Sequence, residues 1–160
     1  MQIGQRCYFL QEATGNYQGR DEQMEFPIEG SCQCGQVTYT LHKPPKMVQA
    51  CHCTECRKLS TSPFSVTAIV DAEDIEFRGN LKEWSRVADS GNLNVAKFCP
   101  DCGNRIYHYN PADTDTVKLK LMPVNVADDT FFEPVRHVWV QEKVSWFQLP
   151  EGTKLYDTQP

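Results

Sequence analysis

Seven of the eight cysteines in this sequence fall into three short clusters, and cysteines at such spacings are typical metal ligands. The clusters are Cys32-Gln33-Cys34-Gly35, Cys51-His52-Cys53-Thr54-Glu55-Cys56 and Cys99-Pro100-Asp101-Cys102-Gly103. A thiolate binds Zn²⁺ at about 2.3 Å, and tetrahedral coordination needs four ligands. Two cysteine pairs supply all four ligands of one ion, whereas a group of three cysteines leaves a second ion one ligand short. The sequence therefore predicts one closed zinc site and one open zinc site.

The two cysteine pairs predict the closed site, which has a structural role. Cys32 and Cys34 lie more than 60 residues before Cys99 and Cys102. Each pair is followed by a glycine, which adopts positive φ readily and so aims backbone N–H groups at sulfur. Metal bound by both pairs would join the first strand to the middle of the chain. We name these residues the four-cysteine cluster.

Cys51, Cys53 and Cys56, named here the three-cysteine cluster, predict the open site. Three protein ligands with one remaining position are the layout of catalytic zinc, where water or substrate is the fourth ligand. His52 stands between two ligands, where strain makes it a poor fourth ligand, so we interpret it as an acid or base beside the site. The alternative is a second closed site completed by a distant histidine. The candidates are His42, His108 and His137.

The composition favours one folded domain and excludes two classes of partner. The chain has 160 residues, of which 40% are hydrophobic, enough to bury a core. The formal charge of −5 would become roughly −8 with seven metal-bound thiolates and two Zn²⁺ (−5 − 7 + 4). Lys and Arg residues are scattered without a basic patch. We therefore expect no binding to nucleic acid or to a membrane surface.

The sequence also predicts a cytoplasmic protein. No apolar run approaches the roughly 20 residues that a membrane helix needs. Residues 1–6 have no apolar segment of the kind found in a signal peptide. In a reducing compartment, clustered cysteines are metal ligands and not disulfides.

Hydrophobic alternation predicts a mainly β fold of antiparallel strands, with turns about every ten residues. Strands are expected at 36–41, 64–70, 75–78, 81–87, 94–98, 105–109, 116–121, 135–140 and 144–147, and one short helical turn at 55–59. In 116–121, Val117, Leu119 and Leu121 share one face. We expect a domain over 26–150, an N-terminal arm over 1–25 that suggests a homodimer, and a frayed tail over 151–160. Cys7, in the arm, has no partner at ligand spacing.

The cysteine motifs together resemble the glutathione-dependent formaldehyde-activating enzyme (GFA) family, which includes centromere-protein-V-like members. The matching motifs are Cys32-x-Cys34-Gly35, Cys51-His52-Cys53-x-x-Cys56-Arg57-Lys58 and Phe98-Cys99-Pro100-x-Cys102-Gly103, with Trp139 and Trp146 as weaker matches. The resemblance covers about 26–150. It implies an Mss4-like β-tent with zinc knuckles, a structural zinc on the four-cysteine cluster and a catalytic zinc on the three-cysteine cluster. His52, and Arg57-Lys58 after the third cysteine, place the chain in the broader branch of that family.

An open three-thiolate zinc would lower the pKa of an arriving thiol and hold its sulfur as a nucleophile. The matching reaction is reversible addition of a thiol such as glutathione, as co-substrate, to a small aldehyde. Its reverse cleaves a carbon–sulfur bond, so the predicted class is a carbon–sulfur lyase resembling S-(hydroxymethyl)glutathione synthase. We expect His52 to move the proton and Arg57 or Lys58 to hold a substrate carboxylate. The alternative is a non-catalytic binding module in which both zinc ions are structural.

Overall fold

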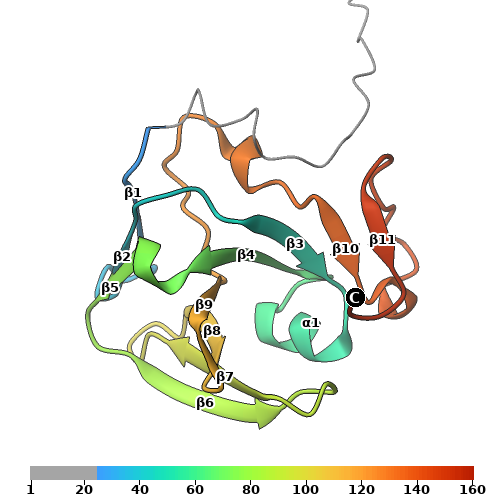
Figure 1. Ribbon diagram of the computed structural model, residues 1–160, viewed down its shortest axis with the longest axis horizontal. Helices are drawn as coiled ribbons and strands as arrows, with labels where there is room; N and C mark the ends of the chain where they lie inside the picture. The colour runs from blue at the N-terminus through green and yellow to red at the C-terminus, as the bar shows by residue number, and fades with distance from the viewer. Residues whose placement is uncertain (1–24) are drawn as a thin grey trace, which may run out of the picture.

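The computed structural model describes residues 25–160, which fold mainly as β-structure (Figure 1). The strands are β1 (Ile28–Ser31), β2 (Thr38–Leu41), β3 (Met47–Cys51), β4 (Ser65–Asp71), β5 (Ile75–Arg78), β6 (Lys82–Val87), β7 (Leu93–Phe98), β8 (Arg105–Asn110), β9 (Asp113–Leu119), β10 (Arg136–Val138) and β11 (Lys154–Tyr156). The helices are α1 (Thr54–Ser60) and the short 3-10 helices η2 (Ala72–Asp74), η3 (Asp129–Phe132) and η4 (Val140–Glu142). Cys7 and the rest of the predicted arm up to residue 24 lie outside the described residues.

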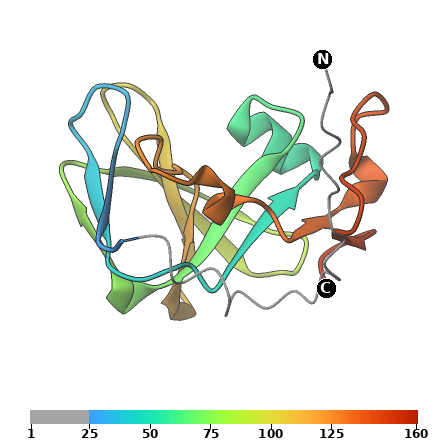
Figure 2. The same cartoon turned by 90° about the horizontal axis from the view of Figure 1, so that it is seen from above.

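The strands form two sheets. A three-stranded sheet has the order β1-β2-β5, and an eight-stranded sheet has the order β11-β10-β3-β4-β9-β8-β7-β6. Most neighbours are antiparallel, which confirms the predicted fold class, while β10 runs parallel to both β3 and β11. The three-stranded sheet lies at the opposite end of the molecule from β10 and β11 (Figure 2). Within residues 25–160, no helix combines the length and the apolar character needed to cross a bilayer.

The C-terminal third differs from the sequence expectation in two places. Residues 144–147 form a turn instead of a strand, because the Phe147 ring packs in a local aromatic cluster, 4.9 Å from the Phe64 ring. An apolar side chain in such a cluster gives the same sequence signal as one on a sheet face. Within the predicted tail, Lys154–Tyr156 forms β11 at the edge of the large sheet.

The two faces of the large sheet have different chemistry. One face carries Val48, Ala68, Val117 and Leu119, which are buried together in the main hydrophobic core. Side chains alternate between faces along a strand, so the residues between these positions point the other way. The register aligns Gln49 with Thr67 in this second set, which is mostly polar and includes Cys51.

The sheet bends around α1, so that β3 and β4 lie on one side of the helix and the β6–β7 hairpin on the other (Figure 1). Strong right-handed twist accumulates over many neighbouring strands and curls a sheet of this size. The polar face is on the inside of the bend. Residues far apart in the sequence therefore face a common space next to α1.

Candidate metal centres and the adjoining cavity

The four-cysteine cluster gathers four sulfurs within 4.8 Å of one another. The Cys32 and Cys34 sulfurs are 3.5 Å apart, and those of Cys34 and Cys99 are 3.7 Å apart. Four sulfurs around Zn²⁺ at about 2.3 Å have tetrahedral edges of roughly 3.8 Å. All seven cysteines in the described residues are free thiols and not disulfides. The donor set and its spacing therefore fit a zinc ion.

Tight turns hold these sulfurs in place. Gly35 and Gly103 have φ of 78° and 75°, in the left-handed region that glycine tolerates best. The turn at Gly35 closes with its N–H donating to the Cys32 carbonyl at 2.9 Å. The Val37 N–H donates to the Cys32 sulfur at 3.2 Å, which stabilises the thiolate that a metal requires.

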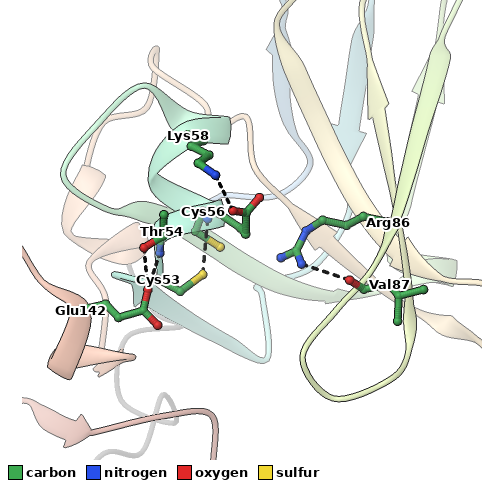
Figure 3. Close-up of polar contacts among 8 residues, drawn as sticks. Cys53, Thr54, Cys56, Lys58, Arg86, Val87 and Glu142 are labelled. Atoms are coloured by element: carbon green, nitrogen blue, oxygen red, sulfur yellow. Dashed lines mark hydrogen bonds and ion pairs between the residues drawn. The ribbon is translucent and has the colours of Figure 1, made fainter.

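The three-cysteine cluster is built where β3 leads into α1. Cys51 ends β3, Cys53 is the N-cap of α1, and Cys56 lies in its first turn, with all three sulfurs within 4.8 Å. The Cys56 N–H donates to the Cys53 sulfur at 3.4 Å (Figure 3). Hydrogen bonds from the Cys51 and Cys53 thiols hold the pKa of Cys56 far below its usual range. Contacts with Cys53 and Cys56 raise the pKa of the Cys51 thiol, so the crowded sulfurs favour a single thiolate, on Cys56, and a bound cation would have to stabilise the other two.

No other His, Cys, Asp or Glu of residues 25–160 joins the three-cysteine cluster at ligand distance. The three histidines considered as a fourth ligand have other partners: His137 hydrogen-bonds to His52 at 2.8 Å, His108 to Arg105 at 2.7 Å, and His42 faces Glu76 at 3.4 Å. This geometry supports the open-site interpretation over a closed site completed by a distant histidine.

Glu142 fixes the start of α1. Its Oε2 accepts from both the N–H of Thr54 at 2.7 Å and the Thr54 hydroxyl at 2.8 Å (Figure 3). Arg57 Nη1 donates to the Glu142 carbonyl at 3.2 Å. An acceptor at a helix N-terminus satisfies an N–H that has no partner inside the helix. The turn of chain bearing Cys53 and Cys56 is therefore tied to η4.

A cavity of about 440 Å³ adjoins the three sulfurs. Four cations line it, namely Arg86, Lys118, Lys120 and Arg136, and Asp89 is the only Asp or Glu among the lining residues of the described chain. These cations come from β6, β9 and β10 and the residue after β9. The sequence shows them as scattered charges, but the bend of the sheet brings them to one space. The cavity thus favours an anionic ligand although the chain is acidic overall.

Lys120 is half-buried among these cations. Its Nζ donates to Thr67 Oγ1 at 2.5 Å and to Ser65 Oγ at 3.2 Å, and burial lowers its pKa. Together with Cys56 it also lines a second cavity of about 340 Å³. The sequence did contain a signal: Lys118 and Lys120 alternate with the core residues of β9 and so belong to the opposite face.

Arg86 faces the cluster from the β6–β7 hairpin. Its side chain extends from β6 toward the side of α1 that carries Cys56 (Figure 3). Nη1 donates to the carbonyl of Val87 at 3.3 Å, and the buried Nε has no partner among the described residues. An arginine with unused donors at a cavity wall is suited to a carboxylate.

His52 and Arg57 do not line this cavity. The His52 ring is fully buried between Phe64 and Phe147, and burial lowers its pKa to about 4. Arg57 and Lys58 line a shallow hollow on the outer side of α1. Lys58 Nζ forms a salt bridge with Glu55 Oε1 at 2.7 Å. The catalytic roles expected for His52 and Arg57 remain predictions. Both residues lie beside the cavity and neither lines it.

The two tryptophans that resemble family positions have different surroundings. Trp139 lines the 440 Å³ cavity beside the three sulfurs and has φ of 58°, uncommon for a bulky residue. Trp146 is 67% exposed and lies near Arg57. Of the two, only Trp139 can touch a ligand in the 440 Å³ cavity.

Comparison with known proteins adds a family and a fold. A family model described as glutathione-dependent formaldehyde-activating enzyme matches residues 27–142, more than half of the chain. The crystal structure of a Rhodobacter sphaeroides protein superimposes with a TM-score of 0.52 at 18% identity, covering 69% of this chain and 100% of that chain. At that identity the likeness shows the fold alone. No curated protein gives a significant match.

Proposed function

This chain belongs to the glutathione-dependent formaldehyde-activating enzyme family, and from that premise we propose that it adds a thiol such as glutathione reversibly to formaldehyde or a similar small aldehyde. The observation that carries the proposal is the three-cysteine cluster, which lies on a cavity wall without a fourth side-chain ligand from residues 25–160. The reaction forms a carbon–sulfur bond and its reverse breaks one. The proposed class is therefore a carbon–sulfur lyase.

The Cys51, Cys53 and Cys56 sulfurs would hold the catalytic ion, and the four-cysteine cluster a structural one. When bound there, zinc would lower the pKa of an arriving thiol and so supply a nucleophilic sulfur at neutral pH. The protein positions these ligands through the Glu142 contacts to α1. Tetrahedral all-thiolate donor sets are typical zinc sites, so we propose zinc for both clusters.

The cavity cations support a thiol that carries carboxylates, as glutathione does at both ends. Arg86 has unused donors, and Arg136 is oriented by Gln49, whose Oε1 accepts from its Nε at 2.8 Å and its Nη2 at 2.6 Å. Lys118 adds an exposed charge at the rim. Such a wall attracts an anionic thiol and orients its sulfur toward the cluster.

For His52 and Arg57 we propose positioning roles. The His52 N–H donates to the Val138 carbonyl at 3.0 Å, and its ring bonds to His137, so the segment between two ligands is fixed to β10. Arg57 links α1 to η4 through the Glu142 carbonyl. Both residues would then hold the cluster in shape without touching substrate.

Exchange spectroscopy with ¹³C-formaldehyde and glutathione tests the proposal. We expect zinc-loaded protein to accelerate interconversion of formaldehyde and the S-hydroxymethyl adduct above the uncatalysed rate, with the equilibrium unchanged. Cys53→Ser is the matched control and should return the rate to the uncatalysed value. Wild-type protein with both sites loaded and no acceleration would contradict the proposal.

A cobalt-loaded sample separates an enzyme from a binding module. Glutathione should perturb the absorption of cobalt at the three-cysteine cluster and leave that of the four-cysteine cluster unchanged. Cobalt spectra indifferent to thiol at both clusters would favour the non-catalytic module with two structural ions.

A further inference from the structure

Lys120 occupies a place on the sheet that brings its ammonium to the three-cysteine cluster. The register pairs Leu119 with Ala68 on β4, so the next residue, Lys120, stands beside Thr67. On the same face of β4, Ser65 is paired with Cys51. Lys120 and Cys56 line both the cavity of about 440 Å³ and the cavity of about 340 Å³. The ammonium therefore shares its cavity walls with one of the three sulfurs.

The hydrogen bonds of Lys120 leave one donor unused. An ammonium has three N–H groups, and the Ser65 and Thr67 hydroxyls accept two of them. No Asp or Glu of residues 25–160 forms an ion pair with it. The third N–H is therefore free to face the cavity.

The proposed reaction needs such a donor. The sulfur lone pair forms the new carbon–sulfur bond while the carbonyl π pair moves to oxygen, and the proton released by the thiol ends on that oxygen. Four thiolates around Zn²⁺ give the metal group a charge of about −2, which makes it a weak partner for a second negative atom. A preorganised cationic N–H in a buried site is the usual means of stabilising a developing oxyanion.

We propose that Lys120 is a catalytic residue that donates a hydrogen bond to the aldehyde oxygen as negative charge develops on it, an inference that rests on the proposed function. Two other polar groups at the site are already engaged. Arg136 is held by Gln49. His108 accepts from Arg105 at its Nε2 and contacts Asn94 through its Nδ1 at 3.2 Å.

Kinetics of Lys120→Met and Arg86→Met separate this role from substrate binding. Lys120→Met should lower the exchange rate at saturating glutathione about a hundredfold and change glutathione affinity, measured by calorimetry, less than about threefold. Lys120→Arg, which keeps a charged donor, should recover part of the rate. Arg86→Met should instead weaken glutathione binding about tenfold. Lys120→Met with a wild-type rate, or with a loss explained wholly by weaker glutathione binding, would overturn the inference.

Binding of two unreactive thioethers gives a readout independent of turnover. S-(carboxymethyl)glutathione carries negative oxygens two atoms from its sulfur, whereas the methyl group of S-methylglutathione carries no charge. The ratio of their affinities should fall about tenfold in Lys120→Met and stay unchanged in Arg86→Met, because only Lys120 is expected to contact those oxygens. An unchanged ratio in Lys120→Met would also overturn the inference.

Metal analysis and a second variant test whether Lys120→Met acts only by disturbing the fold or the metal sites. Lys120→Met should keep two zinc ions and the wild-type circular dichroism. If Lys120→Met loses zinc or structure, Thr67→Val takes its place in both experiments. Thr67→Val removes one acceptor that orients the Lys120 ammonium, so the effects should be smaller and in the same directions. No change in either readout for Thr67→Val would then refute the inference. If exchange is absent in the wild type, the proposed function fails first, and the affinity ratio still tests the placement of Lys120.

Discussion

The two cysteine clusters use the same ligand atoms but differ in what surrounds them. The four-cysteine cluster is made entirely from two turns, and the Gln33 N–H joins one turn to the Asn104 side chain of the other at 2.7 Å. The three-cysteine cluster lies between the end of a strand and the first turn of a helix, beside a cavity with cationic walls. Ligand chemistry alone would not separate them.

We propose that this difference makes one sulfur site structural and leaves the other open to chemistry. Val37 and Ile106 pack around the four-cysteine cluster in a small buried core, so metal there closes two turns onto apolar side chains. Val138 packs against one side of the three-cysteine cluster, and polar residues and the cavity lie on the other side. Removing metal from the first site should therefore affect folding, and removing it from the second should affect the site alone.

The largest expected effect is the loss of the four-cysteine site. Cys99→Ser should abolish cooperative thermal unfolding, because Cys99 is fully buried and structural zinc supplies about 10–16 kcal/mol in small zinc domains. That amount is comparable to the whole stability of a typical domain, roughly 5–15 kcal/mol. Calorimetry and zinc analysis provide the measurement. A Cys99→Ser protein with wild-type melting temperature would show that this cluster is not structural.

Cys53→Ser should have the opposite profile. Serine is a good N-cap, so the N–H of Cys56 keeps an acceptor and α1 should remain folded. The expected zinc content falls from about two ions to about one, and thiol–aldehyde exchange falls at least a hundredfold, whereas the melting temperature changes by only a few degrees. If Cys53→Ser aggregates as Cys99→Ser does, the three-cysteine cluster is structural too.

A smaller effect should come from Glu142→Ala, which changes only the contacts that hold the N-terminus of α1 in place. It removes the acceptor for the N–H and hydroxyl of Thr54, and loss of a cap costs about 1 kcal/mol. Zinc affinity at the three-cysteine cluster should fall about fivefold, measured by competition with a chelator, with no change at the four-cysteine cluster. Glu142→Gln retains an acceptor oxygen and should lie between Glu142→Ala and the wild type. Equal weakening of both clusters would contradict the separation between them.

Local spacing allowed much of this arrangement to be predicted. The cysteine groupings follow from turns of a few residues, whose geometry hardly depends on the rest of the fold. Alternation along β9 likewise predicts that Val117 and Leu119 are buried, as the core confirms. What local patterns could not predict is the bend of the large sheet, which brings Arg86, Lys120 and Arg136 to one cavity from distant strands.

Neighbours in sequence were poor guides to side-chain direction at the site. Cys51 and Cys53 flank His52 in extended chain, where positions i and i+2 share one side and i+1 points to the other. His52 therefore lies in the aromatic cluster behind the sulfurs. Arg57 follows Cys56 on a helix, where one residue is a rotation of about 100°. Both residues lie next to ligands in the sequence and face away from the cavity.

The smallest expected effect tests whether Arg57 faces away from the cavity. Arg57→Met removes a donor to the Glu142 carbonyl on the outer side of α1 and leaves the cavity cations in place. Glutathione affinity, measured by calorimetry on zinc-loaded protein, should change less than about threefold, since a hydrogen bond of this kind contributes only about 1 kcal/mol to stability. Arg86→Met, with the same loss of charge, provides the matched comparison. Binding weakened about tenfold by Arg57→Met and unaffected by Arg86→Met would return the carboxylate-binding role to Arg57, as its position in the sequence suggests.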